Sequence, residues 1–322
     1  MIHSSIFSEG RLVGRDLELE ALRLVRADKG LLLWVDLDEP TDEEARQILE
    51  GVFQFHPLAI EDCVTPSSLP KVEDYDDYLF MVMHAVDFSR AGKFSTTELD
   101  LFLGRDYLVT YHRRPLGSVR TVLDRVTKTS GAVARASDRL AHSILDLLVD
   151  NYGPTIAAFR EELEHIEEAV LSRTAPDFIN DLLEVRSELY HLREIIGPQR
   201  DVINRLAHGE AKQIRAVLLP YFRDLRDKLL RIDETAGGYV EQLLISFDLF
   251  LNKSAFEANE GIKVLTALTA LTVPATVIGT WYGMNFENMP EIHSPWGYLA
   301  ASAVTVACTA WVWFWCRRRR WI

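Results

Sequence analysis

Polar side chains that could bind a cation stand in a short segment between two long uncharged runs near the C-terminus. This segment, TWYGMNFENMPEIHSPWGY (residues 280–298), contains Asn285, Glu287 and Glu291 but no lysine or arginine. Mg²⁺ gives up its water reluctantly, so neutral amide oxygens that hydrogen-bond the hydrated ion suit it better than a tight cage of carboxylates. Nearby glutamates raise the local cation concentration, although solvated glutamates of an ordinary exposed loop are the alternative. The segment is therefore a candidate cation-binding loop centred on Asn285.

The two uncharged runs beside this loop have the length of membrane spans. Residues 264–284 and 295–316 contain no charged side chain, and about 20 apolar residues cross the ~30 Å core of a bilayer. Tryptophan and tyrosine gather at both ends of the pair, as they do at membrane surfaces. Two buried helices of a soluble core are the alternative, but such helices are usually shorter. We therefore predict a lipid bilayer as a partner of the chain.

The distribution of charge predicts the orientation and excludes one class of partner. Arg317, Arg318, Arg319 and Arg320 follow the second run, Lys263 precedes the first, and the loop between them has no basic residue. The positive-inside rule then places both termini in the cytoplasm of a multi-pass protein of the inner (plasma) membrane. The first 260 residues carry a net charge of about −16, which disfavours nucleic acid and favours divalent cations.

The rest of the chain changes from strand to helix patterns near residue 115. LLLWVDL (31–37) reads as a buried strand, and the capping box formed by Thr41 and Glu44 opens a helix after it. Residues 78–88 and 96–113 add three candidate strands, which gives a mixed sheet of four to six strands. Residues 143–172 and 177–207 show helical periodicity, as does one long stretch from about residue 219 to 282. We predict an α+β domain of a mixed sheet flanked by helices, a long stalk helix and two transmembrane helices.

The predicted organisation follows the chain in order and ends in a short basic tail. We expect a sheet portion (1–115) and a helical portion (116–218) of one cytoplasmic domain, followed by the stalk helix (219–260). After the stalk we expect a pore-lining first span (261–284), an external loop (285–295), a second span (296–316) and the tail (317–322).

Five threonines share one face of the first span. At 100° per residue, Thr266, Thr269, Thr272, Thr276 and Thr280 fall within an arc of about 120°, which Asp248 and Asn259 extend below the membrane. Threonines that only bond their own helix carbonyls are one explanation, and a water-filled path along this face is the other. Because two spans cannot enclose a pore, the second explanation requires a closed ring of several chains.

The loop and its surroundings closely resemble the CorA family of magnesium transporters. Its hallmark, YGMN followed by MPE between two C-terminal spans, matches residues 282–285 and 289–291. Further family-like segments are HPLAIEDC (56–63), LPKVEDYDDYLF (69–80), SILDLLVDNY (143–152), PYFRDLRDKL (220–229) and the closing RRRRWI. The resemblance thus covers nearly the whole chain.

The resemblance implies a homopentameric, gated channel that carries Mg²⁺ and also Co²⁺ or Ni²⁺. It implies a selectivity filter of Gly283, Met284 and Asn285. It also implies a regulatory Mg²⁺ site that includes Asp224, with Asp87 as its partner across the subunit interface. Glu287 and Glu291 would attract cations to the outer mouth. The pore-lining residues expected from the resemblance and the helix face together are Asp248, Asn259, Ile262, Leu265, Val273, Thr276 and Thr280.

Two other functions remain open from the sequence, and neither is enzymatic. A zinc transporter of the ZntB branch shares Gly-Met-Asn, but zinc prefers nitrogen and sulfur ligands, and the loop offers only His293. A membrane-anchored sensor or scaffold would use its spans only as a tether. We expect no enzyme, since the acidic and histidine residues form no catalytic pattern distinguishable from solvated helix faces.

Overall fold

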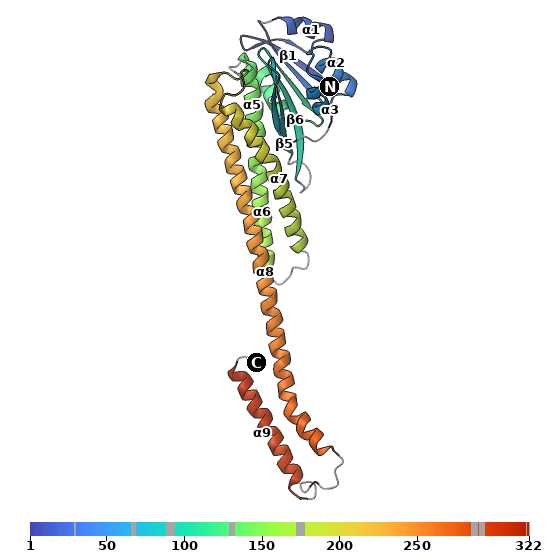
Figure 1. Ribbon diagram of the computed structural model, residues 1–322, viewed down its shortest axis with the longest axis vertical. Coiled ribbons are helices and arrows are strands. Elements are labelled where there is room, and N and C mark those ends of the chain that lie inside the picture. Colours follow the sequence, from blue (N-terminus) through green and yellow to red (C-terminus); the bar gives the residue numbers. More distant parts are fainter. Residues whose placement is uncertain are drawn as a thin grey trace. The chain divides into compact units, whose positions relative to one another are not determined.

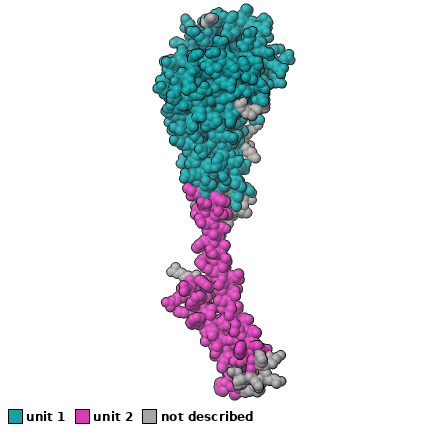
Figure 2. Space-filling view, viewed as in Figure 1, with its two compact units in different colours: residues 1–244 teal, residues 245–322 magenta. Residues whose placement is uncertain are grey.

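The computed structural model describes residues 1–28, 30–65, 69–87, 94–128, 133–171, 178–284, 289, 294–319 and 321 of the chain. The chain divides into two compact units, residues 1–244 and 245–322 (Figure 2). The finer division into sheet portion, stalk, spans, loop and tail that the sequence suggests stays a prediction.

A seven-stranded mixed sheet forms the centre of the first unit. Its order is β2-β1-β3-β7-β6-β5-β4, and only the β3–β7 pair is parallel. The mixed sheet confirms the fold prediction, but the expected four to six strands were too few. The strands are β1 (Ile2–Ser8), β2 (Arg11–Arg15), β3 (Leu32–Asp38), β4 (Lys71–Asp74), β5 (Tyr78–Asp87), β6 (Ser95–Gly104) and β7 (Tyr107–His112).

Helices cover both faces of this sheet (Figure 1). Apolar residues of α1 to α3 share one buried core with side chains of the central strands, Val35 and Phe102 among them. The other face is covered by α5 and α7, which contact strands β3 to β7 between them. These helices of the first unit are α1 (Leu19–Ala27), α2 (Asp42–Leu49), α3 (Pro57–Val64), α4 (Gly117–Lys128), α5 (Ser137–Asp150), α6 (Tyr152–Leu171) and α7 (Phe178–Ala207), with short 3₁₀ helices at Val133–Arg135 and Ala216–Leu218.

Local sequence signals account for where several of these helices begin and end. The predicted capping box opens α2, because Thr41 Oγ1 accepts from the amide of Glu44 and the Glu44 carboxylate accepts from the amide of Thr41. The single helix expected over residues 143–172 is instead two, which meet at Asn151. Pro154 has no amide to donate to the carbonyl of Asp150, which explains why α5 does not continue into α6.

Two buried side chains complete the sheet beyond the end of β4. β4 pairs with β5 only as far as Val82. Further along β5, the amide of His84 donates to Oε1 of Gln199 at 2.9 Å, and its carbonyl accepts from the Tyr152 hydroxyl at 2.7 Å. Buried backbone groups that lack hydrogen bonds destabilise a fold. Gln199 of α7 and Tyr152 of α6 therefore take the place of the hydrogen bonds that a longer β4 would make to β5.

A buried polar network lies where the parallel strands β3 and β7 end. His112, only 2% exposed, places Nε2 3.2 Å from Oδ1 of Asp36 and Nδ1 2.8 Å from the carbonyl oxygen of Arg114. Asp36 also accepts from the hydroxyl of Thr110 at 2.6 Å. Burial alone would lower the pKa of His112, but the hydrogen bond and charge of Asp36 outweigh it and raise that pKa.

This raised pKa predicts how stability depends on pH. The imidazolium gains its partners only on folding, so its stabilisation is complete below the unfolded pKa of about 6.5 and is lost as pH rises through the higher folded pKa. We expect His112→Gln to lower the melting temperature of the detergent-solubilised chain more at about pH 5.5 than at about pH 8.5. Equal losses at both values would show that the ring serves only as a neutral hydrogen-bonding group.

Two helices carry the uncharged runs. α8 (Leu219–Tyr282) is one continuous helix of 64 residues that passes the boundary between the units, and Pro274 does not interrupt it. α9 (Gly297–Arg318) contains the second run. Both are long and apolar enough to cross a membrane, and only 6% of the most apolar window of each is buried within the chain. This exposure contradicts the alternative of two buried core helices and confirms two candidate transmembrane helices.

Candidate cation pathway

The seven predicted pore-lining residues all lie on α8 and are all exposed in the single chain. Leu265 is 65% exposed and Ile262 is 60% exposed, which is unusual for large apolar side chains of a folded protein. On a helical wheel, the seven fall within an arc of about 120°. We call this set the α8 polar face, although three of its members are apolar. The seven residues are Asp248, Asn259, Ile262, Leu265, Val273, Thr276 and Thr280.

The threonine hydroxyls of this helix donate to the backbone. The hydroxyl of Thr276 donates to the carbonyl of Thr272 at 3.0 Å, and that of Thr280 donates to the carbonyl of Thr276 at 2.6 Å. Thr266, Thr269 and Thr272 do the same one turn back along α8. The local bonding considered from the sequence is therefore present. It also leaves each hydroxyl oxygen with only lone pairs to offer outward, which suits a cation and not an anion.

The α8 polar face points away from α9. Among residues 263–282 of α8, the half-buried or buried ones are Lys263, Ala267, Ala270, Leu271, Pro274 and Ile278. On the wheel these centre about 150° from the threonines. α9 presents a matching stripe of small side chains, which includes Ala301, Thr305 and Cys316. The second span thus covers one side of α8 and leaves the polar side open.

The C-terminal end of α8 leaves little room for a side chain at Gly283. The amide of Gly283 donates to the carbonyls of Gly279 and Thr280, and that of Met284 donates to Trp281, so the helix closes within its last turn. A Cβ on Gly283 would stand 3.1 Å from the Gly279 oxygen, closer than such contacts normally allow. Met284 is 42% exposed. Asn285, Glu287 and Glu291 lie outside the described residues, so their roles as filter and cation-attracting groups stay predictions.

The candidate regulatory residues are described only in part. Asp224 is largely exposed, and its Oδ2 lies 3.8 Å from Nζ of Lys228, one turn further along α8. Lys228 is held more closely by two carboxylates of α5, Asp146 at 2.7 Å and Asp150 at 2.8 Å. Burial would lower the pKa of Lys228, but these two hydrogen bonds raise it. The Asp224 carboxylate therefore remains available to a further ligand.

Asp87, the proposed partner of Asp224, ends β5, but its side chain lies outside the described part of the chain. Within the described residues, no group of three or more histidine, cysteine, aspartate or glutamate side chains is arranged to hold a metal ion. The regulatory site predicted from the sequence combines Asp224 with a residue of a second chain, so a single chain does not test it.

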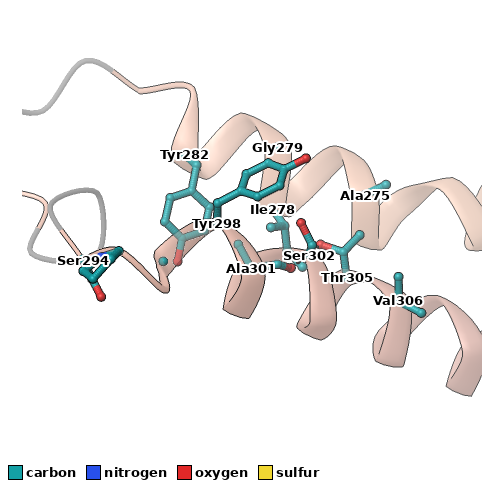
Figure 3. Close-up of a pocket in the computed structure, with 12 residues that line it drawn as sticks. Ala275, Ile278, Gly279, Tyr282, Ser294, Tyr298, Ala301, Ser302, Thr305 and Val306 are labelled. Carbon is teal, nitrogen blue, oxygen red and sulfur yellow. Dashed lines mark hydrogen bonds between the residues drawn. The ribbon is translucent and has the colours of Figure 1, made fainter.

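A cavity of about 550 Å³ lies between the C-terminal end of α8 and the N-terminal end of α9 (Figure 3). Its walls are mostly small or aromatic, with Ala275 and Gly279 from α8 and Ala301 and Thr305 from α9. On the wheel, the α8 residues of this cavity centre about 150° from the α8 polar face. The cavity is therefore separate from the candidate pathway.

Sequence reasoning missed the contacts of two groups of charged residues. Asp146 and Asp150 are one helical turn apart, which signals a shared face, but nothing in the sequence pairs them with Lys228 some 80 residues later. At the other end of the chain, Arg317 and Arg319 each stand four residues after a tryptophan. This spacing does signal contact on a helix, and the structure places both guanidinium groups over the tryptophan rings.

Comparisons with known proteins agree with the geometry. The family model described as "CorA-like Mg2+ transporter protein" matches residues 29–318. YfjQ of Bacillus subtilis (strain 168) is 31% identical over 89% of either chain, and the cobalt/magnesium transport protein CorA of Thermotoga maritima is 27% identical over 92% of this chain and 85% of its own.

Solved structures show the same fold. The CorA magnesium transporter of Methanocaldococcus jannaschii superimposes with a TM-score of 0.85 at 21% identity, covering 100% of this chain and 99% of that one. The cytoplasmic domain of ZntB from Vibrio parahaemolyticus gives 0.61 at 14% identity, covering 70% of this chain and 88% of that one. With the family model matched over most of its length, the chain belongs to the CorA-like Mg²⁺ transporter protein family.

Proposed function

We propose that this chain transports Mg²⁺ across the inner (plasma) membrane through a gated homopentameric channel. Co²⁺ and Ni²⁺ pass as lesser cargo, and cytoplasmic Mg²⁺ closes the channel. The membrane potential drives uptake, since it contributes ~2.3 kcal/mol per charge per 100 mV and twice that for a divalent ion. Both termini lie in the cytoplasm, with the four C-terminal arginines on the inner side.

The observation that carries this proposal is the exposed α8 polar face, which α9 leaves open. Hydroxyl and amide groups in a membrane-spanning helix normally face a partner or a water-filled cavity. A single chain offers neither on this side within its described residues. Around a shared axis, the threonine oxygens, with their protons committed to the backbone, become rings of acceptors for a hydrated cation, while rings of Ile262, Leu265 and Val273 close the path by excluding water.

Exposed apolar residues on α8 support assembly into such a ring. Below the membrane segment, a polar strip of Asp248, Asn252 and Asn259 runs between two apolar strips. One strip consists of Ile245, Leu249 and Phe256, and the other of Leu244 and Leu251; each of these five is at least 46% exposed. In a cyclic assembly, one strip of each copy meets the other strip of its neighbour, and the polar strip faces the axis. This arrangement buries both strips.

The proposal is tested by ion uptake into liposomes that contain the purified protein. Vesicles loaded with a Mg²⁺-sensitive dye should show uptake that grows with an inside-negative potential, and vesicles with a Zn²⁺-sensitive dye should show much less. Zinc uptake without magnesium uptake would favour the zinc-transporter alternative and overturn the proposal. No uptake of either ion would favour a membrane-anchored sensor or scaffold.

Closure by cytoplasmic Mg²⁺ predicts a specific effect of Asp224. We expect Asp224→Asn to weaken inhibition, so that roughly tenfold more internal Mg²⁺ is needed to halve the uptake rate, because one charged ligand is lost from each site. Asp146→Asn is the matched control, because it removes the same charge from a carboxylate that Lys228 already neutralises. Uptake rate against internal Mg²⁺ measures both. Equal shifts in the two variants would mean that general surface charge controls closure.

A further inference from the structure

The cytoplasmic end of α9 holds its arginines against tryptophan rings. The guanidinium carbon of Arg317 lies 5.3 Å from the ring centroid of Trp313, and that of Arg319 lies 5.7 Å from the ring centroid of Trp315. Trp321 packs edge-on against Trp315 with centroids 5.3 Å apart, because its amide donates back to the carbonyl of Cys316. We call these contacts the two Arg–Trp pairs, Arg317–Trp313 and Arg319–Trp315.

The two Arg–Trp pairs lie on opposite flanks of α9. Taking the buried Cys316 as zero on the helical wheel, the Arg317 pair falls at about 60–100° and the Arg319 pair at about 260–300°. Arg318 points outward at about 200° and stacks on no ring among the described aromatic contacts. Among the three described arginines, Arg317 and Arg319 thus stack on a tryptophan ring, whereas Arg318 does not.

Among the described residues of the second unit, no acidic side chain pairs with these arginines. None of the ion pairs or side-chain hydrogen bonds found among the described residues involves Arg317, Arg318 or Arg319. In the described part of the second unit the acidic residues are Asp248, Glu257 and Glu260, and Glu260 already pairs with Lys263. The backbone carbonyls at the end of α9 are occupied by the amides of Arg319 and Trp321. Within the described part of the chain, the hydrogen-bonding groups of the three guanidinium side chains are thus left for a further ligand.

We propose that the two Arg–Trp pairs bind the phosphate groups of anionic phospholipids in the cytoplasmic leaflet. A planar guanidinium matches two phosphate oxygens at once, and stacking on tryptophan fixes its orientation and reduces the entropy lost on binding. Tryptophan rings rest at the depth of the lipid headgroups. Since α9 covers the side of α8 opposite the polar face, the pairs lie at the lipid-facing periphery of a ring of copies. The proposal rests on the membrane-spanning assignment of α9 but not on ion conduction.

The experiment measures lipid retention by the full-length protein. Protein in detergent is mixed with equal amounts of phosphatidylglycerol and phosphatidylcholine, and the lipids that remain bound are counted by native mass spectrometry. We expect preferential retention of phosphatidylglycerol, and a loss of preference of about fivefold for Arg317→Gln or Arg319→Gln, which corresponds to ~1 kcal/mol per arginine. No preference in the unmodified protein would overturn the proposal.

Matched variants distinguish binding through the two Arg–Trp pairs from unspecific attraction of anionic lipid by positive charge. Arg318→Gln removes the same charge without breaking a pair and should reduce the preference clearly less than Arg317→Gln. Trp313→Leu keeps every charge and should still reduce it. Equal effects of the three arginine variants together with no effect of Trp313→Leu would overturn the proposal, as would displacement of the lipid by inorganic phosphate. Ion uptake by the same variants shows separately whether conduction survives.

Discussion

Replacing Asn285 with alanine is expected to reduce Mg²⁺ uptake to the level of liposomes without protein, while the assembly stays intact. α8 closes at Gly283 and Met284, and Asn285 follows them in the sequence, at the start of the proposed outer loop. Around a symmetry axis, one amide per chain becomes a ring of carbonyl oxygens that replaces second-shell water around the ion. Alanine offers no side-chain acceptor, so the whole ring is lost through one substitution.

Asn288→Ala is the matched control for this experiment, because it removes the same amide from the same loop outside the YGMN segment. We expect its uptake to remain close to that of the unmodified protein. Dye-loaded liposomes measure uptake, and light scattering after size exclusion measures the assembly. Normal uptake by Asn285→Ala would exclude the amide ring and favour the sensor or scaffold alternative.

Features that depend on short-range order could be predicted from the sequence. The threonine arc follows from the fixed 100° step of a helix, and the structure confirms a continuous α8. The capping box at Thr41 and Glu44 depends on four consecutive residues and was likewise predictable. The strands β1, β2 and β4 were missed. β2 is a five-residue edge strand with no fully buried side chain, and β4 is an edge strand of four residues, so both carry little hydrophobic pattern.

Contacts between distant parts of the chain were harder to predict. Lys228 meets Asp146 and Asp150 across 82 and 78 residues, and only the packing of α8 against α5 brings them together. The carboxylate of Asp224 lies 3.8 Å from Nζ of Lys228, too far for a hydrogen bond, so it stays open to the metal ion that the family resemblance implies. Its predicted partner, Asp87, would come from another chain, and no pattern within one sequence predicts how close two side chains of different chains lie.

Phe256→Asp is expected to prevent assembly of the ring and thereby to stop Mg²⁺ uptake. Phe256 is 64% exposed in the single chain, so a carboxylate there costs the fold of one copy little. In a ring, the same side chain lies buried against the neighbour, and losing a central aromatic contact costs about 2 kcal/mol or more at each interface. Burying an unpaired carboxylate adds to this cost. Because every interface contains the substitution, the effect repeats around the ring.

The matched control is Ser254→Asp, which introduces the same charge two residues earlier and about 160° around the helix from Phe256. On the wheel, Ser254 lies about 140–180° from the strip that contains Phe256 and about 60–80° from the other strip, so its variant should assemble and transport. Mass measurement of the solubilised protein distinguishes a ring from single copies, and the same samples are then tested for uptake. If Phe256→Asp remained a full ring, the apolar strips would not be the subunit contact. If it dissociated yet still transported Mg²⁺, the path would lie within one chain, and the open polar face of α8 would need another explanation.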